Sequence, residues 1–204
     1  MGTTGASVFI VEDDEAAREG LRHLVESVGL ETRAFSSADE FLGSYNEEWC
    51  GCLLLDVRMP GMSGLKLQDE LNRRGSKLSI LFLTGHGDVA MAVETLKKGA
   101  LDFVEKPAGG QHLLDKVYDA IKESTRLRQQ EAVAEGIRSK LGLLTSRERE
   151  VLDRVKAGKQ PKLIARELGL SRKTVDWHLS VIRQKMGVES SSELILLLHR
   201  ADQS

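Results

Sequence analysis

The segment SVFIVEDD, residues 7–14, sets a short apolar run directly before three acidic residues. Further runs of this kind are CLLL (52–55), SILFL (79–83) and LDFV (101–104), and a weaker one covers 31–35. Short runs rich in β-branched and aromatic residues are typical of strands that are buried on both faces of a sheet. The sequence therefore predicts five such strands in its first part.

Helical patterns separate the predicted strands. Apolar residues recur at helical spacing in the stretches 16–27, 37–45, 65–74, 88–98 and 111–121. Strands that alternate with helices indicate a parallel sheet covered by helices on both faces. We therefore predict an α/β fold, a doubly wound five-stranded parallel sheet, for a first domain over residues 1–123. Ligands of this fold bind beyond the carboxyl ends of the strands.

The remainder of the chain is expected to be all helical. Residues 124–142 are polar and helix-prone, and we interpret them as a helical linker, because Gly136 and several glutamines weaken a coiled-coil interpretation. Beyond it, turns at glycines separate helical patterns at 146–155, 162–168, 172–186 and 192–201. These patterns predict a smaller all-α domain of four helices over 143–204.

The composition is that of an ordinary soluble protein, with 41% hydrophobic and 29% charged residues. No apolar run approaches the roughly 20 residues that a membrane helix needs, and the N-terminus lacks the basic start of a secretory signal. We therefore expect a cytoplasmic protein that does not contact the membrane. Cys50 and Cys52 lie too close to staple a fold and have no zinc-type cluster beside them, so we interpret both as buried thiols.

The net charge of −2 hides a strong asymmetry. Residues 1–123 carry 13 Lys and Arg against 21 Asp and Glu, a net −8, whereas residues 124–204 carry 16 against 10, a net +6. A basic half is suited to a polyanion such as DNA. Two solvated surfaces of opposite sign would produce the same numbers, so charge alone does not decide between these interpretations.

Polar residues that carry chemistry follow the predicted strands. Glu12 and Asp13 follow the first strand, Asp56 follows the third, Thr84 ends the fourth and Lys106 comes just after the fifth. The carboxyl ends of parallel strands meet at one edge, so three carboxylates would share a pocket, where a divalent cation relieves their repulsion. Oxygen ligands favour Mg²⁺. The set suits a phosphoryl group on the Asp56 carboxylate, with the metal, the lysine and the hydroxyl holding its oxygens.

Each of these residues also has an ordinary structural interpretation. Asp13 or Asp14 could cap the next helix, Asp56 could open a turn, and Lys106 could be a solvated surface lysine. Taken singly, these interpretations are preferable. Their conjunction on successive strand ends, in order, favours the shared pocket.

In this region the chain resembles the receiver domain of two-component response regulators, over residues 7 to about 123. The resemblance rests on VEDD (11–14), DVRMPGMSG (56–64), TGHGD (84–88) and GALDFVEKP (99–107), which are most similar to the FixJ branch of the NarL/FixJ subfamily. It implies that Asp56 is the phosphoacceptor and Asp13 the main metal ligand. It further implies that Glu12 is an outer partner and that the main-chain carbonyl of Arg58 completes the Mg²⁺ site.

The same resemblance implies a switch. Thr84 and Phe103 match a pair in which the hydroxyl turns toward the phosphoryl oxygen and the aromatic ring follows inward, although Phe103 could instead be a plain core aromatic. Ala108 departs from the aromatic residue that is usual after the Lys106-Pro107 pair, and the Pro107 bond is expected to be cis.

A second motif lies at PKLIARELGLSRKTVDWHLSVIRQKM, residues 161–186. A short helix, a Gly-Leu turn and a longer helix have helix-turn-helix spacing, and Ser171 is a good cap for the second helix. An αα-hairpin that binds protein or nothing would have the same outline. Flanking cations favour DNA, because phosphate contacts supply most sequence-independent affinity; they are Lys159, Lys162, Arg166, Arg172, Lys173, Arg183 and Lys185.

Residues 144–194 resemble the LuxR-type DNA-binding domain, through LTSREREVL, KLIAREL, SRKTVDWH and KMGVESSSEL. The resemblance implies that residues 172–185 form the recognition helix and that the last helix, 192–201, pairs in a dimer. The residues implied to contact phosphate are Lys173, Thr174 and Lys185, and those on the base-facing side are Asp176, Trp177 and Ser180. Lys162 and Arg172 are further expected DNA-binding residues. Asp176 could accept a hydrogen bond from a cytosine amino group, and Trp177 could contact DNA or pack inside the domain.

These observations predict a transcription factor that a sensor histidine kinase phosphorylates on Asp56. Phosphorylation is expected to shift dimerisation and the binding of a two-fold double-stranded DNA site, with RNA polymerase as a further partner. One rival is a metal-dependent phosphatase, but such sites commonly carry an acid where Arg58 stands, so we expect no turnover of an external substrate beyond slow self-dephosphorylation. The other is a phosphorylation-independent regulator, which the complete acidic pocket disfavours.

Overall fold

The computed structural model describes residues 6–85, 93, 95–106 and 109–202. The chain divides into two compact units, Met1–Arg128 and Gln129–Ser204. No helix among the described residues is both long and apolar enough to cross a membrane. Each unit is built around a core of its own.

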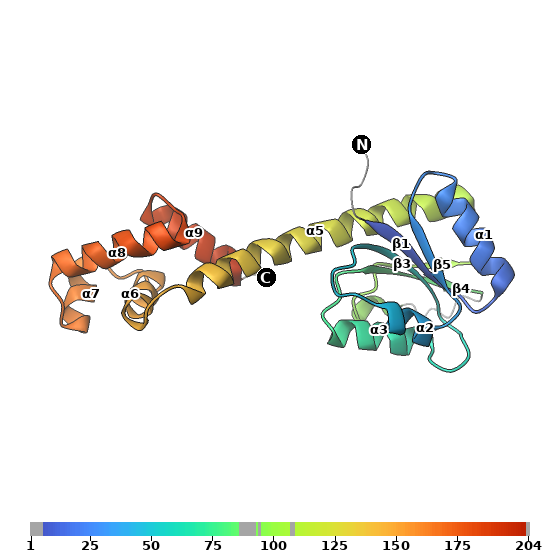
Figure 1. The fold of residues 1–204 in the computed structure, drawn as a ribbon, viewed down its shortest axis with the longest axis horizontal. Coiled ribbons are helices and arrows are strands. Elements are labelled where there is room, and N and C mark those ends of the chain that lie inside the picture. The colour runs from blue at the N-terminus through green and yellow to red at the C-terminus, as the bar shows by residue number, and fades with distance from the viewer. Residues whose placement is uncertain (1–5, 86–92, 94, 107–108, 203–204) are drawn as a thin grey trace. The chain divides into compact units, whose positions relative to one another are not determined.

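The first unit contains a five-stranded parallel sheet with the order β2-β1-β3-β4-β5 (Figure 1). The strands are β1 (Ser7–Val11), β2 (Thr32–Phe35), β3 (Gly51–Asp56), β4 (Ser79–Thr84) and β5 (Asp102–Glu105). The helices are α1 (Glu15–Glu26), α2 (Ala38–Ser44), α3 (Gly64–Arg73) and the first part of α5 (Gly110–Gly142). This confirms the predicted doubly wound α/β fold. The predicted helix at 88–98, as well as Pro107 and Ala108, lies wholly or largely outside the described residues.

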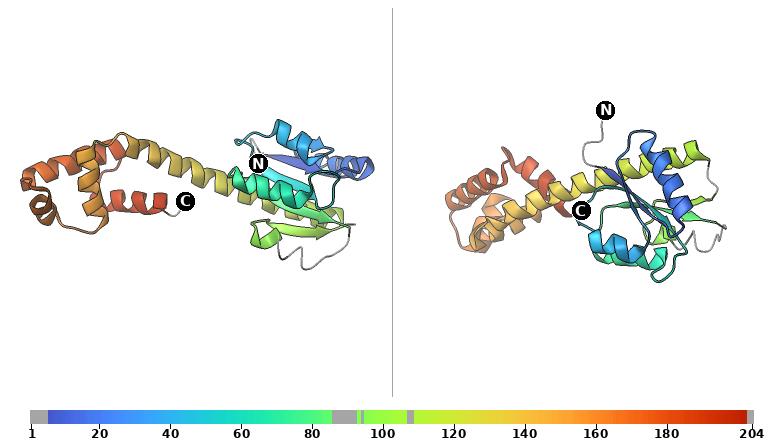
Figure 2. Two further views of the ribbon diagram at one scale, coloured as in Figure 1. Left: turned by 90° about the horizontal axis from the view of Figure 1, so that it is seen from below. Right: turned by 45° about the vertical axis from the view of Figure 1, so that its right-hand side comes forward.

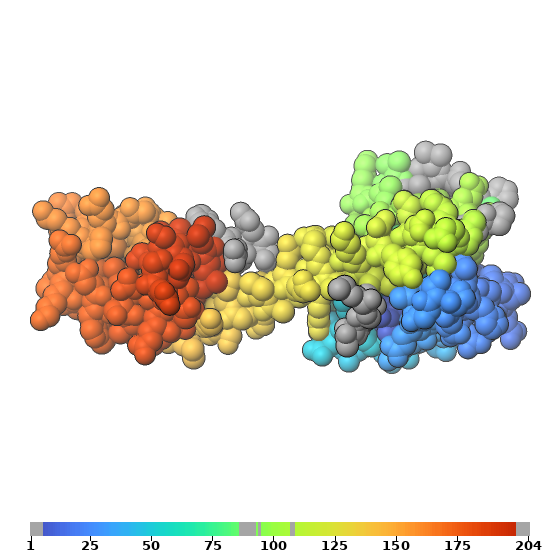
Figure 3. Space-filling view, turned by 90° about the horizontal axis from the view of Figure 1, so that it is seen from above, coloured from blue at the N-terminus to red at the C-terminus, as the bar shows by residue number. Residues whose placement is uncertain are grey.

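Both faces of the sheet are buried, since alternate strand residues point to opposite sides. On one side Phe9, Leu53 and Phe82 pack with α2 and α3, which the left panel of Figure 2 shows together. On the other side the core includes Val25 of α1 and Val117 of α5. These two helices lie beside each other in the space-filling view of Figure 3. The predicted continuous apolar strands are therefore confirmed.

Side-chain caps fix where the helices of the first unit begin. The Asp14 carboxylate accepts a hydrogen bond from the amide of Ala17 at 2.7 Å, and Ser37 and Ser63 cap α2 and α3 in the same way. Such caps satisfy amides that have no partner inside the helix. Asp14 thus acts as a helix cap, which leaves Glu12 and Asp13 as the acids available to the pocket.

The second unit contains α6 (Ser146–Lys156), α7 (Pro161–Leu168), α8 (Arg172–Met186) and α9 (Ser191–Asp202). Gly169 and Gly187 end α7 and α8 with φ values of 65° and 71°, a left-handed conformation that glycine adopts without strain. Buried Ile164, Val175 and Ile182 tie the helices into one core. The predicted four-helix domain is confirmed.

Residues 124–142, predicted as a helical linker, are helical in the structure. Helix α5 runs without a break from Gly110 to Gly142, so the helix predicted to end at residue 121 is too short. Ser124 is buried in the first unit, where its hydroxyl accepts from Gly51 N at 2.8 Å and donates to the Lys77 carbonyl at 2.6 Å. Ile137 belongs to the core of the second unit. The polar composition of this stretch gave no sign that Ser124 and Ile137 are buried in the two units.

The two cysteines also differ from each other. Cys52 is fully buried and free, as predicted, and burial raises the pKa of its thiol. Cys50 is only partly buried, and its Sγ lies 3.5 Å from the Ser124 hydroxyl. The prediction that both thiols are buried is therefore wrong for Cys50.

Candidate functional site

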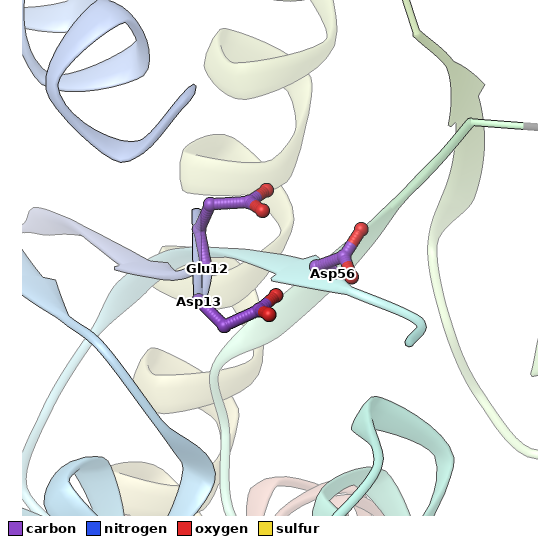
Figure 4. Close-up of side chains that lie close together, drawn as sticks. All are labelled: Glu12, Asp13 and Asp56. Atoms are coloured by element: carbon purple, nitrogen blue, oxygen red, sulfur yellow. The ribbon is translucent and has the colours of Figure 1, made fainter. Parts of the chain in front are cut away.

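Three carboxylates meet at the carboxyl end of the sheet (Figure 4). Glu12 and Asp13 directly follow β1, and Asp56 is the last residue of β3. One carboxylate oxygen from each residue lies within 4.8 Å of the other two. Glu12 and Asp56 are only 3% and 8% exposed, whereas Asp13 is open to solvent. The strand register, which pairs Val11 with Leu55, produces this convergence.

Neighbouring main-chain contacts hold the acids in place. The guanidinium of Arg18 donates to the Glu12 carbonyl at 2.8 Å, and the amide of Arg58 donates to Asp56 Oδ2 at 2.9 Å. A Cβ atom at Gly64 would lie 2.2 Å from the Asp56 carbonyl oxygen, closer than any real contact. Only glycine therefore fits beneath the strand end that carries Asp56.

Lys106 is the cation of the pocket. Its ammonium group donates to Asp56 Oδ1 at 2.9 Å and also to Glu12 Oε2. Burial opposes the charged form of Lys106, but the hydrogen bonds to Glu12 and Asp56 outweigh burial and raise its pKa. Burial raises the pKa of Glu12, against the opposing effect of Lys106. A charged lysine thus lies between two buried carboxylates.

Thr84 and Phe103 lie beside the pocket on the last two strands. Thr84 ends β4 and is buried, and its carbonyl accepts a hydrogen bond from the Lys106 amide at 2.6 Å. Phe103 of β5 is aligned with Phe82 and packs, partly buried, against the core that contains α2 and α3. The fold therefore brings Thr84 to the strand ends with the acids, while the proposed switching of the pair stays a prediction.

The donor set fits a hard divalent cation. Its carboxylate oxygens are the ligands that Mg²⁺ prefers, and their close approach is costly unless positive charge is nearby. The structure gives the amide of Arg58 a contact to Asp56, and the predicted role of the Arg58 carbonyl as a ligand stays a prediction.

Two supporting residues escaped the sequence analysis. Arg18 lies one turn into α1, and its role depends on the side chain folding back to the end of β1. Gly64 begins α3 immediately after the Ser63 cap. The signal for Gly64 was present in the MPGMSG stretch, but a turn explains glycine there equally well.

In the second unit, α8 separates into two faces. Val175, Leu179, Ile182 and Met186 are buried against the core of the unit. The predicted DNA contacts that are exposed on α7 and α8 are Lys162, Arg172, Lys173, Asp176, Trp177 and Ser180. The structure therefore leaves most of the predicted contact residues open to a ligand.

Local contacts organise the first turns of α8. The Ser171 hydroxyl accepts from the Thr174 amide at 3.1 Å and bonds with the Thr174 hydroxyl at 2.8 Å. Arg172 Nε lies 3.8 Å from Asp176 Oδ2, so Asp176 has a cation beside it. Trp177 is 60% exposed, which removes the alternative that it packs inside the domain.

Lys185 differs from the other predicted phosphate contacts. Its ammonium donates to Glu148 Oε2 at 2.7 Å and to the Leu143 carbonyl at 3.1 Å. Glu148 is buried and also receives the Thr145 amide in a capping box at the start of α6. The structure thus uses Lys185 to join the end of α8 to the start of α6, and this ion pair escaped sequence reasoning because its partners lie 37 residues apart.

Comparisons with known proteins agree with both units. Residues 8–118 match the response regulator receiver domain, and residues 142–198 match the luxR family of bacterial regulatory proteins. The transcriptional regulatory protein TdiR of Thauera aromatica is 40% identical over 96% of this chain and 86% of its own length. The transcriptional regulatory protein FixJ of Bradyrhizobium diazoefficiens is 38% identical over 98% of this chain and 97% of its own length.

Solved structures give the same result. The response regulator StyR has 39% identity and a TM-score of 0.83, and the match covers 97% of this chain and all of that one. The structure of FixJ-N has 36% identity and a TM-score of 0.53, and it covers 59% of this chain. The chain therefore belongs to the NarL/FixJ family of two-component response regulators, which are DNA-binding regulators of transcription with a receiver domain and a LuxR-type helix-turn-helix domain.

Proposed function

We propose that a sensor histidine kinase phosphorylates this protein on Asp56. The observation that carries the assignment is the contact of one lysine, Lys106, with the carboxylates of Asp56 and Glu12. In the proposed step an Asp56 oxygen attacks phosphorus, the P–N bond of the donor phosphohistidine breaks, and an acyl phosphate forms. Lys106, whose positive charge contacts the carboxylate of Asp56 before phosphorylation, then pairs with an oxygen of the new phosphoryl group.

Glu12, Asp13 and Asp56, together with the Arg58 carbonyl, would hold Mg²⁺. The bound ion would neutralise negative charge on the transferring phosphoryl group. Arg18 supports this role of the chain by fixing the main chain of Glu12. The Thr84 hydroxyl, at the end of β4, would meet the phosphoryl oxygens, and Phe103 would follow it inward.

We further propose that phosphorylation shifts the protein toward a dimer that binds a two-fold DNA site and recruits RNA polymerase. Exposed apolar side chains that could take part in dimer contacts are Leu101, Tyr118 and Leu196. In the DNA complex, α8 would enter the major groove, with Lys162, Lys173 and Thr174 at phosphates. As a regulator of transcription it would work in the cytoplasm. We expect no turnover of an external substrate, because Arg58 stands where an acid would assist it.

Phosphorylation by acetyl phosphate with Mg²⁺, followed by mass spectrometry of the peptides, tests the assignment. Wild type and Asp69→Asn, which alters an exposed acid on α3, should gain one phosphoryl group on the peptide that contains Asp56. Asp56→Asn should gain none. Labelling of Asp56→Asn at the wild-type level, or labelling of wild type at another residue, would show the assignment to be wrong.

A further inference from the structure

The exposed face of α8 carries an acid among cations. Arg172 and Asp176 stand one helical turn apart, with side chains 72% and 54% exposed, and their nearest charged atoms are 3.8 Å apart. The neighbouring residues Lys173 and Trp177 are exposed as well. The buried residues of α8 point the other way, into the core of the second unit. Arg172 and Asp176 are therefore presented to whatever α8 binds.

Neither helix stability nor DNA affinity explains Asp176. Ser171 already caps α8, and an exposed ion pair contributes little to stability. An acid in a half of the chain with a net charge of +6 weakens attraction to phosphates. The remaining explanation is base recognition, in which the Asp176 carboxylate distinguishes one base from another.

Hydrogen-bond chemistry limits which base Asp176 can recognise. A carboxylate only accepts, and the donors in the major groove are the amino groups of cytosine and adenine. The adenine edge places its own N7 acceptor beside that amino group, where it repels a carboxylate, whereas cytosine itself carries no second acceptor on its major-groove edge. A guanidinium only donates, and guanine offers two acceptors, O6 and N7. The chemistry therefore matches Asp176 to cytosine and Arg172 to guanine.

We propose that Arg172 and Asp176 act together as a sequence-reading pair, in which Asp176 accepts from a cytosine amino group and Arg172 donates to a guanine one or two base pairs away. Residues four apart on a helix are separated by about 6 Å along its axis, a distance comparable to two steps of about 3.4 Å between bases. The distance of 3.8 Å between their charged groups places both side chains on one exposed part of α8. This inference rests on the proposed binding of DNA by α8 and specifies which sequence that helix selects.

Selection of bound duplexes from a random library, with the full-length protein treated with acetyl phosphate, tests the pair. Wild type should enrich cytosine at one position of each half-site and guanine close to it. Asp176→Ala should lose the cytosine preference, with about tenfold less discrimination at that position, and should bind random-sequence DNA more tightly. Asp176→Asn should change the preference from cytosine to adenine, because an amide both donates to N7 and accepts from the amino group.

Asp153→Ala is the matched control, because it removes one negative charge from the exposed surface of α6 and leaves α8 unchanged. It should select the wild-type sequence. A wild-type motif retained by Asp176→Ala and Asp176→Asn would overturn the pair while leaving DNA binding by α8 intact. Wild-type protein that enriches no sequence would instead overturn the proposed function itself. Circular dichroism of each variant ensures that a loss of selection does not come from unfolding.

Discussion

The acidic pocket and the exposed face of α8 hold charges under opposite physical conditions. In the pocket, two nearly buried carboxylates share one lysine, so each group depends on its neighbours. On α8, Arg172, Lys173 and Asp176 stand in solvent, where water and salt screen each charge. A substitution in the pocket should therefore impair phosphorylation strongly, whereas a substitution on α8 should change DNA affinity or selectivity by degrees.

The largest effect is expected from Lys106→Ala. Removing a preorganised cation that faces developing negative charge should slow phosphorylation by acetyl phosphate about 100-fold. Gel mobility of the phosphorylated protein over time measures the rate. Lys66→Ala, at an exposed position on α3, should retain the wild-type rate. A Lys106→Ala rate within twofold of wild type would contradict the view that the pocket depends on this lysine.

Substitutions at two glycines of the same unit test whether the pocket depends on local backbone geometry. A Cβ at Gly64 would lie 2.2 Å from the Asp56 carbonyl oxygen. Gly51 begins β3, at the opposite end from Asp56, and a Cβ there would lie 1.9 Å from the Ser7 carbonyl oxygen. Both alanine variants should lose about 2–3 kcal/mol of unfolding free energy, measured with urea.

Only Gly64→Ala should also slow phosphorylation of the folded protein, because only Gly64 lies beneath Asp56. Equal rates for the two variants, corrected for the folded fraction, would mean that the position of Asp56 is not set by this contact.

Lys173 and Lys185 offer a comparison within α8. Lys173→Ala should remove a phosphate contact, which lowers the slope of log affinity against log salt by about 0.9. Lys185→Ala should leave that slope unchanged. It should lower the unfolding free energy by about 2 kcal/mol, because buried Glu148 loses its partner. The loss is kept this small because water partly screens the Lys185 ammonium. DNA titrations at several salt concentrations measure the slopes. A lower slope for Lys185→Ala would show that this lysine contacts phosphate after all.

The smallest effect concerns pH. The hydrogen bond from Lys185 lowers the pKa of Glu148 below its ordinary value of 4.5. The charged form therefore stabilises the folded protein above that value, and the contribution is lost as pH falls through the lowered pKa. Glu148→Gln should cost about 1 kcal/mol at neutral pH, an estimate reduced for solvent screening. The difference from wild type should shrink in urea titrations below pH 4.5, and a constant difference would contradict the ion pair.

The sequence predicted the pocket better than the surface. Parallel strands must bring their carboxyl ends together, so the order of Glu12, Asp56, Thr84 and Lys106 along the chain already implied their proximity. That inference required no knowledge of side-chain directions. The supporting role of Arg18 could not be predicted in this way, because it depends on one flexible side chain that donates a hydrogen bond to the main-chain carbonyl of Glu12.

The second unit shows the limit of local patterns. Apolar spacing predicted α6, α7, α8 and α9, and the glycine turns predicted where α7 and α8 end. The resemblance to the LuxR-type domain placed Lys185 at phosphate, and nothing near it in sequence indicates its partner, a buried glutamate on α6. Local patterns also indicated a spacer at residues 124–142, although Ser124 and Ile137 are buried in different units.

The central claim is that phosphorylation of Asp56 controls binding of DNA by α8. The most direct measurement is the affinity of wild type and Asp56→Asn for a duplex selected by the wild type, with and without acetyl phosphate and Mg²⁺. Wild-type affinity should rise about tenfold or more on phosphorylation, within the range of typical coupling between sites, and Asp56→Asn should not respond. An equal rise in Asp56→Asn, or no rise in phosphorylated wild type, would contradict the account.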